Sequence, residues 1–419
     1  MPQRNCNRIK EKVSKVSKRI VLAIDLERYK EIVKEPEAFR GWIDENIARY
    51  PELFPSEITG GYDLHSTIAS QKLSGMTLRR IRMKGTQKVF TIAPSGVMPY
   101  MTSYTDDVEK ALFLLRFGVP YWALTYVFGK NDMFWFRQFC HFGRYQIVAT
   151  TVKDMEKLPR DLLADEKHIY INGEKAYIAT TVGSDCILGA SISLSADEEG
   201  LTEAYGHFQE EVCHVDPNYE PESVNIDGWT ATRKAWLSLF PLIAIIQCFL
   251  HAFLKIRNCC KKRFKEIYPE IAQRVWGVYK AVDATSFLSE IVSLQSWAEE
   301  KLQGTGSALQ SIQKLCLKAD QFVLAFEHPN AYRTSNMIDR HMLPMDRWLF
   351  HTQSFHGHLS SAEKAVRAWA IFHSFWEYSP RANIRKKFKS PAHKINGFVY
   401  HDNWLHNMLI STSIAGAKS

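Results

Sequence analysis

The chain has 419 residues, of which 46% are hydrophobic and 23% charged, a balance typical of a soluble globular protein with two or three domains. Eight cysteines without a C-x-x-C pair, and a charged start without a signal-peptide apolar stretch, argue against a secreted disulfide scaffold and favour the reducing cytosol. The formal charge of +8 suggests an anionic partner but does not identify one.

The first hundred residues combine a helical pattern with a cationic hairpin. Residues 1–60 carry apolar side chains at three- and four-residue spacing, interrupted by prolines, so they are expected to be mainly helical. Residues 76–93 predict two strands joined around Gly85. The first strand carries three candidate contacts to DNA phosphates, although a solvated hairpin face would have the same composition. They are Arg79, Arg80 and Arg82.

Residues 101–155 predict a helix-turn-helix region. A helix, an F-G-V-P turn, a short helix and a break at Gly129 precede a third helix over Met133–Arg144. In such a motif the last helix enters the DNA major groove, whereas in a plain helical hairpin it would only pack against a core. The candidate DNA contacts on this helix are Arg137, Gln138, His141 and Arg144.

From residue 156 onward the pattern becomes a mixed α/β order. Three short strands, with turns at 172–173 and 183–185, precede a helix. Two further strands follow, each with a helix after it, which gives the order β-β-β-α-β-α-β-α.

The longest apolar run, Trp236–Leu254, lies within this unit and is long enough to cross a bilayer. However, Pro241 and Gln247 would be costly in lipid, and strands covered on both faces also read as continuous apolar runs. We therefore expect a buried strand over Leu242–Phe249, a helix over Leu250–Tyr268 and no membrane span.

The last third of the chain is mostly helical in pattern. Helices with breaks at Pro269 and at the G-T-G-S sequence are expected up to residue 330, and a long helical stretch follows. The final segment is basic and then apolar. The expected division of the chain is 1–100, 101–155, 156–255, 256–330, 331–380 and 381–419.

Three aspartates occupy positions at which an α/β sheet collects ligands. Asp165 opens the three-stranded unit, Asp227 follows a strand, and Asp339 starts the last long helical stretch. Converging carboxylates repel each other unless a divalent cation neutralises them, and Mg²⁺ or Mn²⁺ suits such oxygen ligands. Two ions held in this way promote phosphoryl displacement. Each aspartate alone has an ordinary alternative, as a strand-edge charge, a helix cap or a helix-start charge.

The stretches V-N-I-D-G-W, C-F-L-H and R-T-S-N-M-I-D-R-H-M resemble the catalytic signatures of prokaryotic insertion-sequence transposases of the DDE type. Cys248 and His251 resemble the C/D-x-x-H motif of the Mutator-type superfamily. The resemblance extends over about residues 100–405. It implies an α/β fold class with an RNase H-like mixed sheet, a helical insertion and a preceding helix-turn-helix DNA-binding region.

The resemblance also implies three catalytic and metal-binding residues. Asp165 matches the first acid, with Glu166 as the alternative, and Asp227 matches the second. Asp339 stands where most such enzymes have Glu, which makes the chain a D-D-D variant, and Glu327 is the alternative third acid. The implied cofactor is Mg²⁺ or Mn²⁺, as two ions.

The roles of Cys248 and His251 are left open between orienting the site, packing in the core and holding a metal. Two ligands alone are a weak sign of zinc.

The implied activity is metal-dependent cleavage of DNA at the ends of a mobile element, followed by attack of the freed 3′-hydroxyl on target DNA. The expected partners are double-stranded DNA and further copies of the chain, because two ends must be brought together. The expected location is the cytoplasm, in association with the nucleoid. The alternatives are an RNase H-like nuclease that does not join strands, and a domesticated protein that binds DNA without catalysis.

Overall fold

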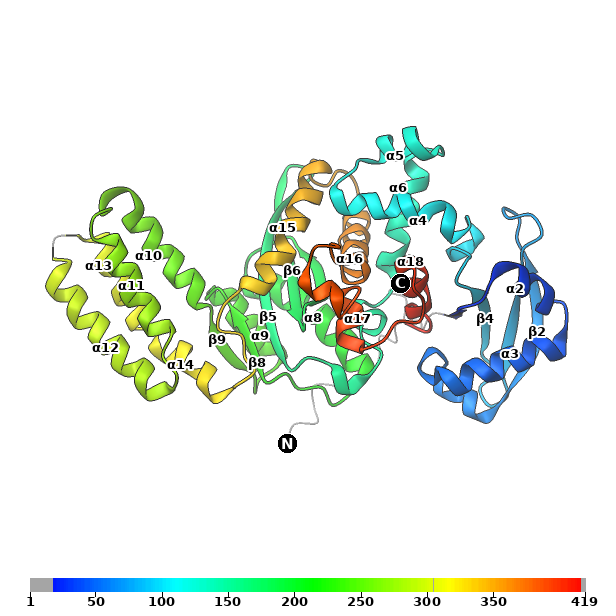
Figure 1. The fold of residues 1–419 in the computed structure, drawn as a ribbon, viewed down its shortest axis with the longest axis horizontal. Coiled ribbons are helices and arrows are strands. Elements are labelled where there is room, and N and C mark those ends of the chain that lie inside the picture. The colour runs from blue at the N-terminus through cyan, green and yellow to red at the C-terminus, as the bar shows by residue number, and fades with distance from the viewer. Residues whose placement is uncertain (1–17, 304, 416–419) are drawn as a thin grey trace.

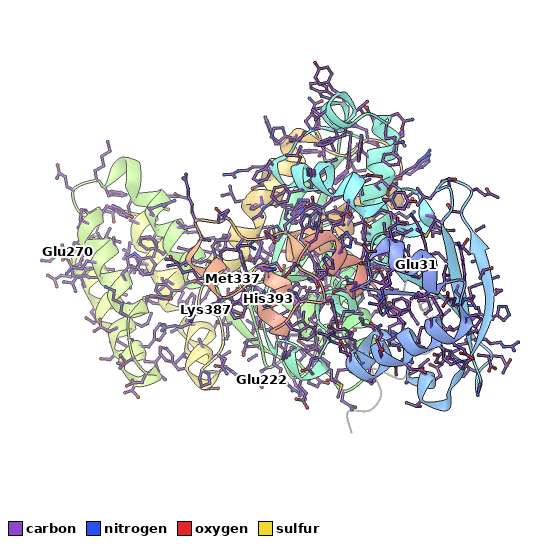
Figure 2. All side chains as sticks on the ribbon, turned by 45° about the vertical axis from the view of Figure 1, so that its right-hand side comes forward. Glu31, Glu222, Glu270, Met337, Lys387 and His393 are labelled. Carbon is purple, nitrogen blue, oxygen red and sulfur yellow. The ribbon has the colours of Figure 1, made fainter. Side chains whose placement is uncertain are left out.

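The computed structural model describes residues 18–303 and 305–415 and has a mixed α/β architecture (Figure 1). An N-terminal sheet lies at one end of the molecule, a five-stranded sheet with helices on both faces lies in the middle, and a helical unit projects at the other end. Figure 2 shows Glu31 of the N-terminal region and Glu270 of the helical unit on opposite sides of the view.

The N-terminal sheet has the strand order β1-β4-β3-β2, with β1 parallel to β4 and the other pairs antiparallel. The hairpin expected at 76–93 is confirmed as β3 and β4, whereas the helical pattern expected for 1–60 missed β1, whose four residues are too few to show a period. The expectation for residues 1–17 lies outside the described residues. The bounds are β1 Arg19–Leu22, α2 Leu26–Ile32, α3 Pro36–Arg49, β2 Tyr62–Ala69, β3 Thr77–Met83 and β4 Val89–Pro94.

The next region contains four short helices, of which α5 and α6 are joined by a tight turn at Gly129. The helix expected over Met133–Arg144 begins one residue earlier, and its last four residues form a separate 3₁₀ turn. Asn131 caps it, because its side chain accepts a hydrogen bond from the Phe134 backbone N–H. The helices are α4 Thr105–Leu114, α5 Tyr121–Phe128, α6 Asp132–Cys140 and α7 Ile147–Thr151.

The central sheet has the order β7-β6-β5-β8-β9. The first three strands form an antiparallel meander, and β8 and β9 continue the sheet parallel to β5. The expected order of strands and helices is confirmed, as is the turn at Asn172 and Gly173, which both have positive φ. The strands are β5 Asp161–Ile171, β6 Glu174–Gly183, β7 Cys186–Ser193, β8 Ser223–Ile226 and β9 Ala244–Gln247.

Helices cover both faces of the central sheet. Leu162 and Ala164 of β5 belong to the core that α8 and α9 share, whereas Leu163 and Ile169 belong to the core that α15 and α16 share. This alternation follows from the two-residue period of a strand. The helices are α8 Glu198–Val215, α9 Thr230–Leu239, α15 Asn336–His351 and α16 Leu359–Phe375.

The apolar run forms a strand and the start of a helix, as expected, although both differ in their bounds. The strand is limited to Ala244–Gln247, and the helix α10 spans Phe249–Arg263 rather than extending to Tyr268. Pro269 begins a new helix instead, in the first-turn position that proline tolerates. Among the described residues, no helix is both long and apolar enough to cross a membrane.

Residues 256–330 are mainly helical, as expected, and together with the start of α10 they form a helical unit with a hydrophobic core of its own. Phe249, at the start of α10, and Phe322, on α14, pack in that core, so the unit closes near the edge of the sheet at β9. Its remaining helices are α11 Tyr268–Tyr279, α12 Ala284–Lys301, α13 Ser307–Cys316 and α14 Ala319–Glu327.

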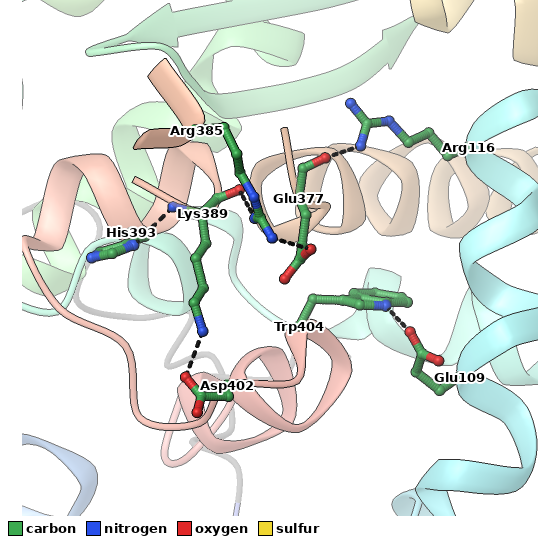
Figure 3. A network of polar contacts seen from close by, with 8 residues as sticks. All are labelled: Glu109, Arg116, Glu377, Arg385, Lys389, His393, Asp402 and Trp404. Carbon is green, nitrogen blue, oxygen red and sulfur yellow. Dashed lines mark hydrogen bonds and ion pairs between the residues drawn. The ribbon is translucent and has the colours of Figure 1, made fainter. Parts of the chain in front are cut away.

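The C-terminal segment, expected to be a basic tail, packs against the rest of the chain. Its helices are α17 Pro391–Asn396 and α18 Trp404–Ser411, and Ser413 donates a hydrogen bond to the Val21 carbonyl of β1. Figure 3 shows two of its basic residues in ion pairs, Arg385 with Glu377 at 2.6 Å and Lys389 with Asp402 at 2.5 Å. The segment is therefore anchored, and only part of its positive charge remains available to a partner.

Candidate active site

Asp165 lies in the middle of β5 on the face that meets α15. Its carboxylate accepts a hydrogen bond of 2.9 Å from the Glu166 backbone N–H. Burial, and after it the charges of Asp227 and Asp339, raise the pKa of Asp165 to about 6, against the opposing effect of His251. Of the three aspartates expected to act together, Asp165 therefore lies within range of the charges of the other two.

Asp227 follows the carboxyl end of β8, next to β5. Its side chain accepts a hydrogen bond of 2.9 Å from the Trp229 backbone N–H, which fixes the turn into α9. Gly228 between them has φ +91°, and a Cβ there would lie 2.7 Å from the Gln247 side-chain nitrogen. Only glycine fits, so the D-G-W sequence holds Asp227 at the end of its strand.

Asp339 lies in the first turn of α15 and shares a cavity with Asp165. Its carboxylate accepts a hydrogen bond of 2.8 Å from the Ser335 hydroxyl. The cavity has a volume of about 350 Å³. Its lining residues are Asp165, Glu166, Lys167, His168, Asp339, Met342, Leu343 and Asp346.

The chemistry of these aspartates fits a divalent cation. Carboxylate oxygens are the ligands that Mg²⁺ and Mn²⁺ prefer, and a cation would stabilise the charge of Asp165, whose pKa is raised by burial first and by Asp227 second. In the part of the chain that the structure describes, no group of three or more His, Cys, Asp or Glu side chains has the arrangement of a metal site. Asp165 and Asp339 share the cavity, whereas Asp227 is not among its lining residues.

Glu166, the alternative first acid, points to the other face of β5. Its carboxylate accepts hydrogen bonds from Tyr205 at 2.8 Å and from Thr232 at 2.6 Å. Burial raises the pKa of Glu166 to about 7, although both hydroxyls act in the opposite direction. The alternative third acid, Glu327, ends α14 and does not line the cavity.

Cys248 and His251 lie at the start of α10, beside the return from the helical unit. The Cys248 thiol accepts a hydrogen bond of 3.1 Å from the Ser335 backbone N–H. A hydrogen bond with Cys248 raises the pKa of His251 to about 9, and the charges of Asp165 and Asp227 add to this effect against burial. Burial acts to raise the pKa of Cys248, but its hydrogen bonds with His251 and Ser335 outweigh burial and lower it.

The three arginines expected to contact DNA from β3 differ in their surroundings. Arg79 turns toward the helices, where it donates hydrogen bonds to the Val33 carbonyl and lies over the Phe39 ring at 5.4 Å. Arg79 therefore has partners within the protein, and its contact with DNA stays a prediction. Arg80, which donates to Ser66 at 2.8 Å, and Arg82 are part-exposed.

The candidate contacts on and after α6 surround a second cavity of about 380 Å³. Arg137 and Arg144 are exposed there, whereas Gln138 is buried and hydrogen-bonded to the Thr102 hydroxyl, so its expected base contact is not available in this structure. Burial, together with Arg144 and Arg19, lowers the pKa of His141 to about 3, so its ring is neutral at pH 7. Two lysines that sequence reasoning missed complete the cationic lining. They are Lys72 and Lys364.

Comparison with models of known protein families and with curated proteins found no match for this chain.

Proposed function

We propose that this chain is a DNA transposase that cleaves strands at the ends of a mobile element and joins the freed 3′-hydroxyls to target DNA. The observation that carries the proposal is that Asp165 on β5 and Asp339 at the start of α15 line one cavity, while Asp227 follows β8, the strand that pairs with β5. An antiparallel meander continued by two parallel strands, with acids at these positions, supports an RNase H-like core.

The three aspartates would hold two Mg²⁺ or Mn²⁺ ions. When bound, such ions activate an attacking oxygen and neutralise the charge that develops on the leaving oxygen. The chain's own contribution is placement, because the D-G-W turn fixes Asp227 and the Ser335 hydroxyl holds Asp339. The cavity between β5 and α15 leaves room for a phosphate beside Asp165.

Double-stranded DNA is the partner that we propose, and two cationic surfaces support it. One is the cavity beside α6 with Arg137 and Arg144 on its rim, which is consistent with a helix-turn-helix that uses this region for DNA. The other is the C-terminal segment, where Arg381, Lys386 and Lys387 are exposed.

Asp185 connects that segment to α15, because it lies 3.6 Å from the Lys394 amine and 3.8 Å from the Arg340 guanidinium.

Two ends of an element must be held together during transposition, so we also propose that the active form is a homo-oligomer on nucleoid DNA in the cytoplasm. The helical unit has its own core and extends away from the sheet, which leaves its outer surface for such contacts.

The test is cleavage and joining by the purified chain, with Mg²⁺, on a plasmid that carries its gene and the flanking DNA. Asp227→Asn should reduce cleavage by about a hundred- to a thousandfold, because it removes a carboxylate charge that would hold the cations at the reacting phosphate. Asp320→Asn, which changes an exposed aspartate on α14, should cleave like the wild type.

Cleavage without joining would favour the nuclease alternative. Sequence-specific binding that survives Asp227→Asn, with no cleavage by the wild type under any metal condition, would favour the non-catalytic DNA-binding protein.

A further inference from the structure

Ser335 lies where the helical unit returns to the sheet, four residues before Asp339. The unit begins directly after β9 and ends before α15, so the position of the third acid depends on how the two ends of the unit meet. The return segment is bonded at two further points: the Phe249 N–H donates to the Arg333 carbonyl at 3.1 Å, and the Asn225 amide donates to the Tyr332 carbonyl at 2.8 Å.

The Ser335 backbone is held by Cys248. Its N–H donates to the Cys248 thiol at 3.1 Å, and its carbonyl accepts from the Asp339 N–H at 3.0 Å, which closes the first turn of α15. Ser335 is 4% exposed and Cys248 is fully buried, so water does not compete for these bonds.

The Ser335 hydroxyl connects His251 to Asp339. A hydroxyl has one hydrogen, and the Asp339 carboxylate can only accept, so the hydroxyl donates to Asp339 at 2.8 Å. The His251 Nδ1 lies 3.4 Å from the same oxygen and must then act as the donor. The chain of bonds runs from His251 through Ser335 to one carboxylate oxygen of Asp339, and the other oxygen makes none of these bonds.

We propose that Ser335 is a positioning residue, held by Cys248 and His251, that fixes the orientation of the Asp339 carboxylate for binding a divalent cation. This inference rests on the proposed function. An aspartate is one methylene shorter than a glutamate, so its reach toward a cation depends more on where its carboxylate is held. Partners of this kind typically change metal affinity by about 10- to 100-fold when they are removed.

The direct test is Mn²⁺ binding by the full-length, DNA-free protein, measured by the loss of the free-ion paramagnetic resonance signal. Ser335→Ala should weaken Mn²⁺ binding about tenfold. The sharper pair is Ser335→Thr and Ser335→Val, which have nearly the same shape and differ in the hydroxyl. The Thr variant should bind Mn²⁺ about tenfold more tightly than the Val variant, whatever the extra methyl group costs in packing.

Thermal unfolding separates positioning from folding, because Thr and Val variants with similar melting temperatures but different Mn²⁺ affinities cannot differ through stability alone. Ser311→Ala is the control, since that hydroxyl donates to the Ser307 carbonyl within the helical unit. The Mn²⁺ concentration for half-maximal cleavage should follow the same order as the binding affinities.

Equal Mn²⁺ affinity in the Ala variant and the wild type, or in the Thr and Val variants, would overturn the inference. Asp227→Asn distinguishes this result from failure of the proposed function. If Asp227→Asn abolishes Mn²⁺ binding while the Ser335 variants keep it, only the role of Ser335 is wrong. If the wild type binds no Mn²⁺, the proposed metal site is wrong, and the inference fails with it.

Discussion

Asp165 and Glu166 are adjacent in the sequence, and the alternation of a strand separates their roles. Both residues line the cavity, but Asp165 lies on the face of β5 that meets α15, whereas the Glu166 carboxylate accepts hydrogen bonds from Tyr205 of α8 and Thr232 of α9 on the other face. The sequence predicted that either residue could be the first acid of the site. Residue types alone could not distinguish them, because the distinction depends on which helices cover each face of β5.

A second residue-scale feature is Asp185 in the turn between β6 and β7. Burial acts to raise its pKa, but the His341 ring at 3.5 Å and the hydrogen bond from the Tyr378 hydroxyl, followed by the nearby Lys394 charge, outweigh burial and lower the pKa below its usual range. A carboxylate whose pKa is lowered by folding stabilises the fold above its unfolded pKa, near 4. That contribution is lost as the pH falls through the lower, folded pKa.

We therefore expect Asp185→Asn to reduce the free energy of unfolding by about 1–3 kcal/mol at pH 7. The difference from the wild type should shrink as the pH falls below about 4, because the Asp185 carboxyl of the unfolded wild type then binds a proton while the folded carboxyl stays charged, which lowers the wild-type free energy of unfolding. Urea unfolding of both proteins between pH 7 and pH 3 measures this difference. A difference that does not change with pH would mean that the Asp185 charge contributes nothing.

At the scale of elements, the strands of the central sheet could be predicted because each has an apolar run with clear turns on both sides. The N-terminal strand β1 could not be predicted, because its partner β4 is some seventy residues away in sequence and no local pattern indicates the parallel pairing. The proposed role of Ser335 could not be predicted either. It depends on the hydrogen bond from the Ser335 backbone N–H to the Cys248 thiol, which joins residues about ninety positions apart.

One buried ion pair links several elements. Arg367 on α16 pairs with Glu211 on α8 at 2.5 Å, and its guanidinium also donates to the carbonyls of Gly143 and Tyr145. Glu211 in turn accepts hydrogen bonds from the N–H groups of residues 147 and 148 at the start of α7. The pair joins helices from both faces of the sheet to the helical region before it.

Arg367→Met should lower the free energy of unfolding by about 3–5 kcal/mol, because it leaves the Glu211 charge buried without its cationic partner. Lys30→Met, which removes an exposed pair with Glu27, should cost less than about 1 kcal/mol. Chemical denaturation of the two variants compares the costs directly. Equal costs would show that the buried pair is not needed to hold these elements together.

At the scale of the whole molecule, the two cationic surfaces and the acid site should act on one DNA substrate. Electrostatic binding releases counterions, so the affinity for duplex DNA should fall steeply as the salt concentration rises. Each phosphate contact contributes about 0.9 to the slope of log affinity against log salt.

The double variant Arg137→Gln with Arg144→Gln should reduce that slope by about 2, measured by fluorescence anisotropy with a labelled duplex. The double variant Lys34→Gln with Lys280→Gln is the control. It changes exposed lysines in the turn after α2 and directly after α11, and it should leave the slope unchanged. If both double variants lowered the slope equally, binding would depend on total charge and not on the surface beside α6.

The sequence predicted the three candidate acids, but their arrangement in space could only come from the fold. The central claim is that these aspartates bind divalent cations together, and the most direct measurement is anomalous diffraction from crystals of the protein grown with Mn²⁺. We expect manganese peaks between β5 and α15, bound by oxygens of Asp165, Asp227 and Asp339. Peaks elsewhere, or none at these residues at millimolar Mn²⁺, would contradict a metal-dependent phosphoryl-transfer centre in this chain.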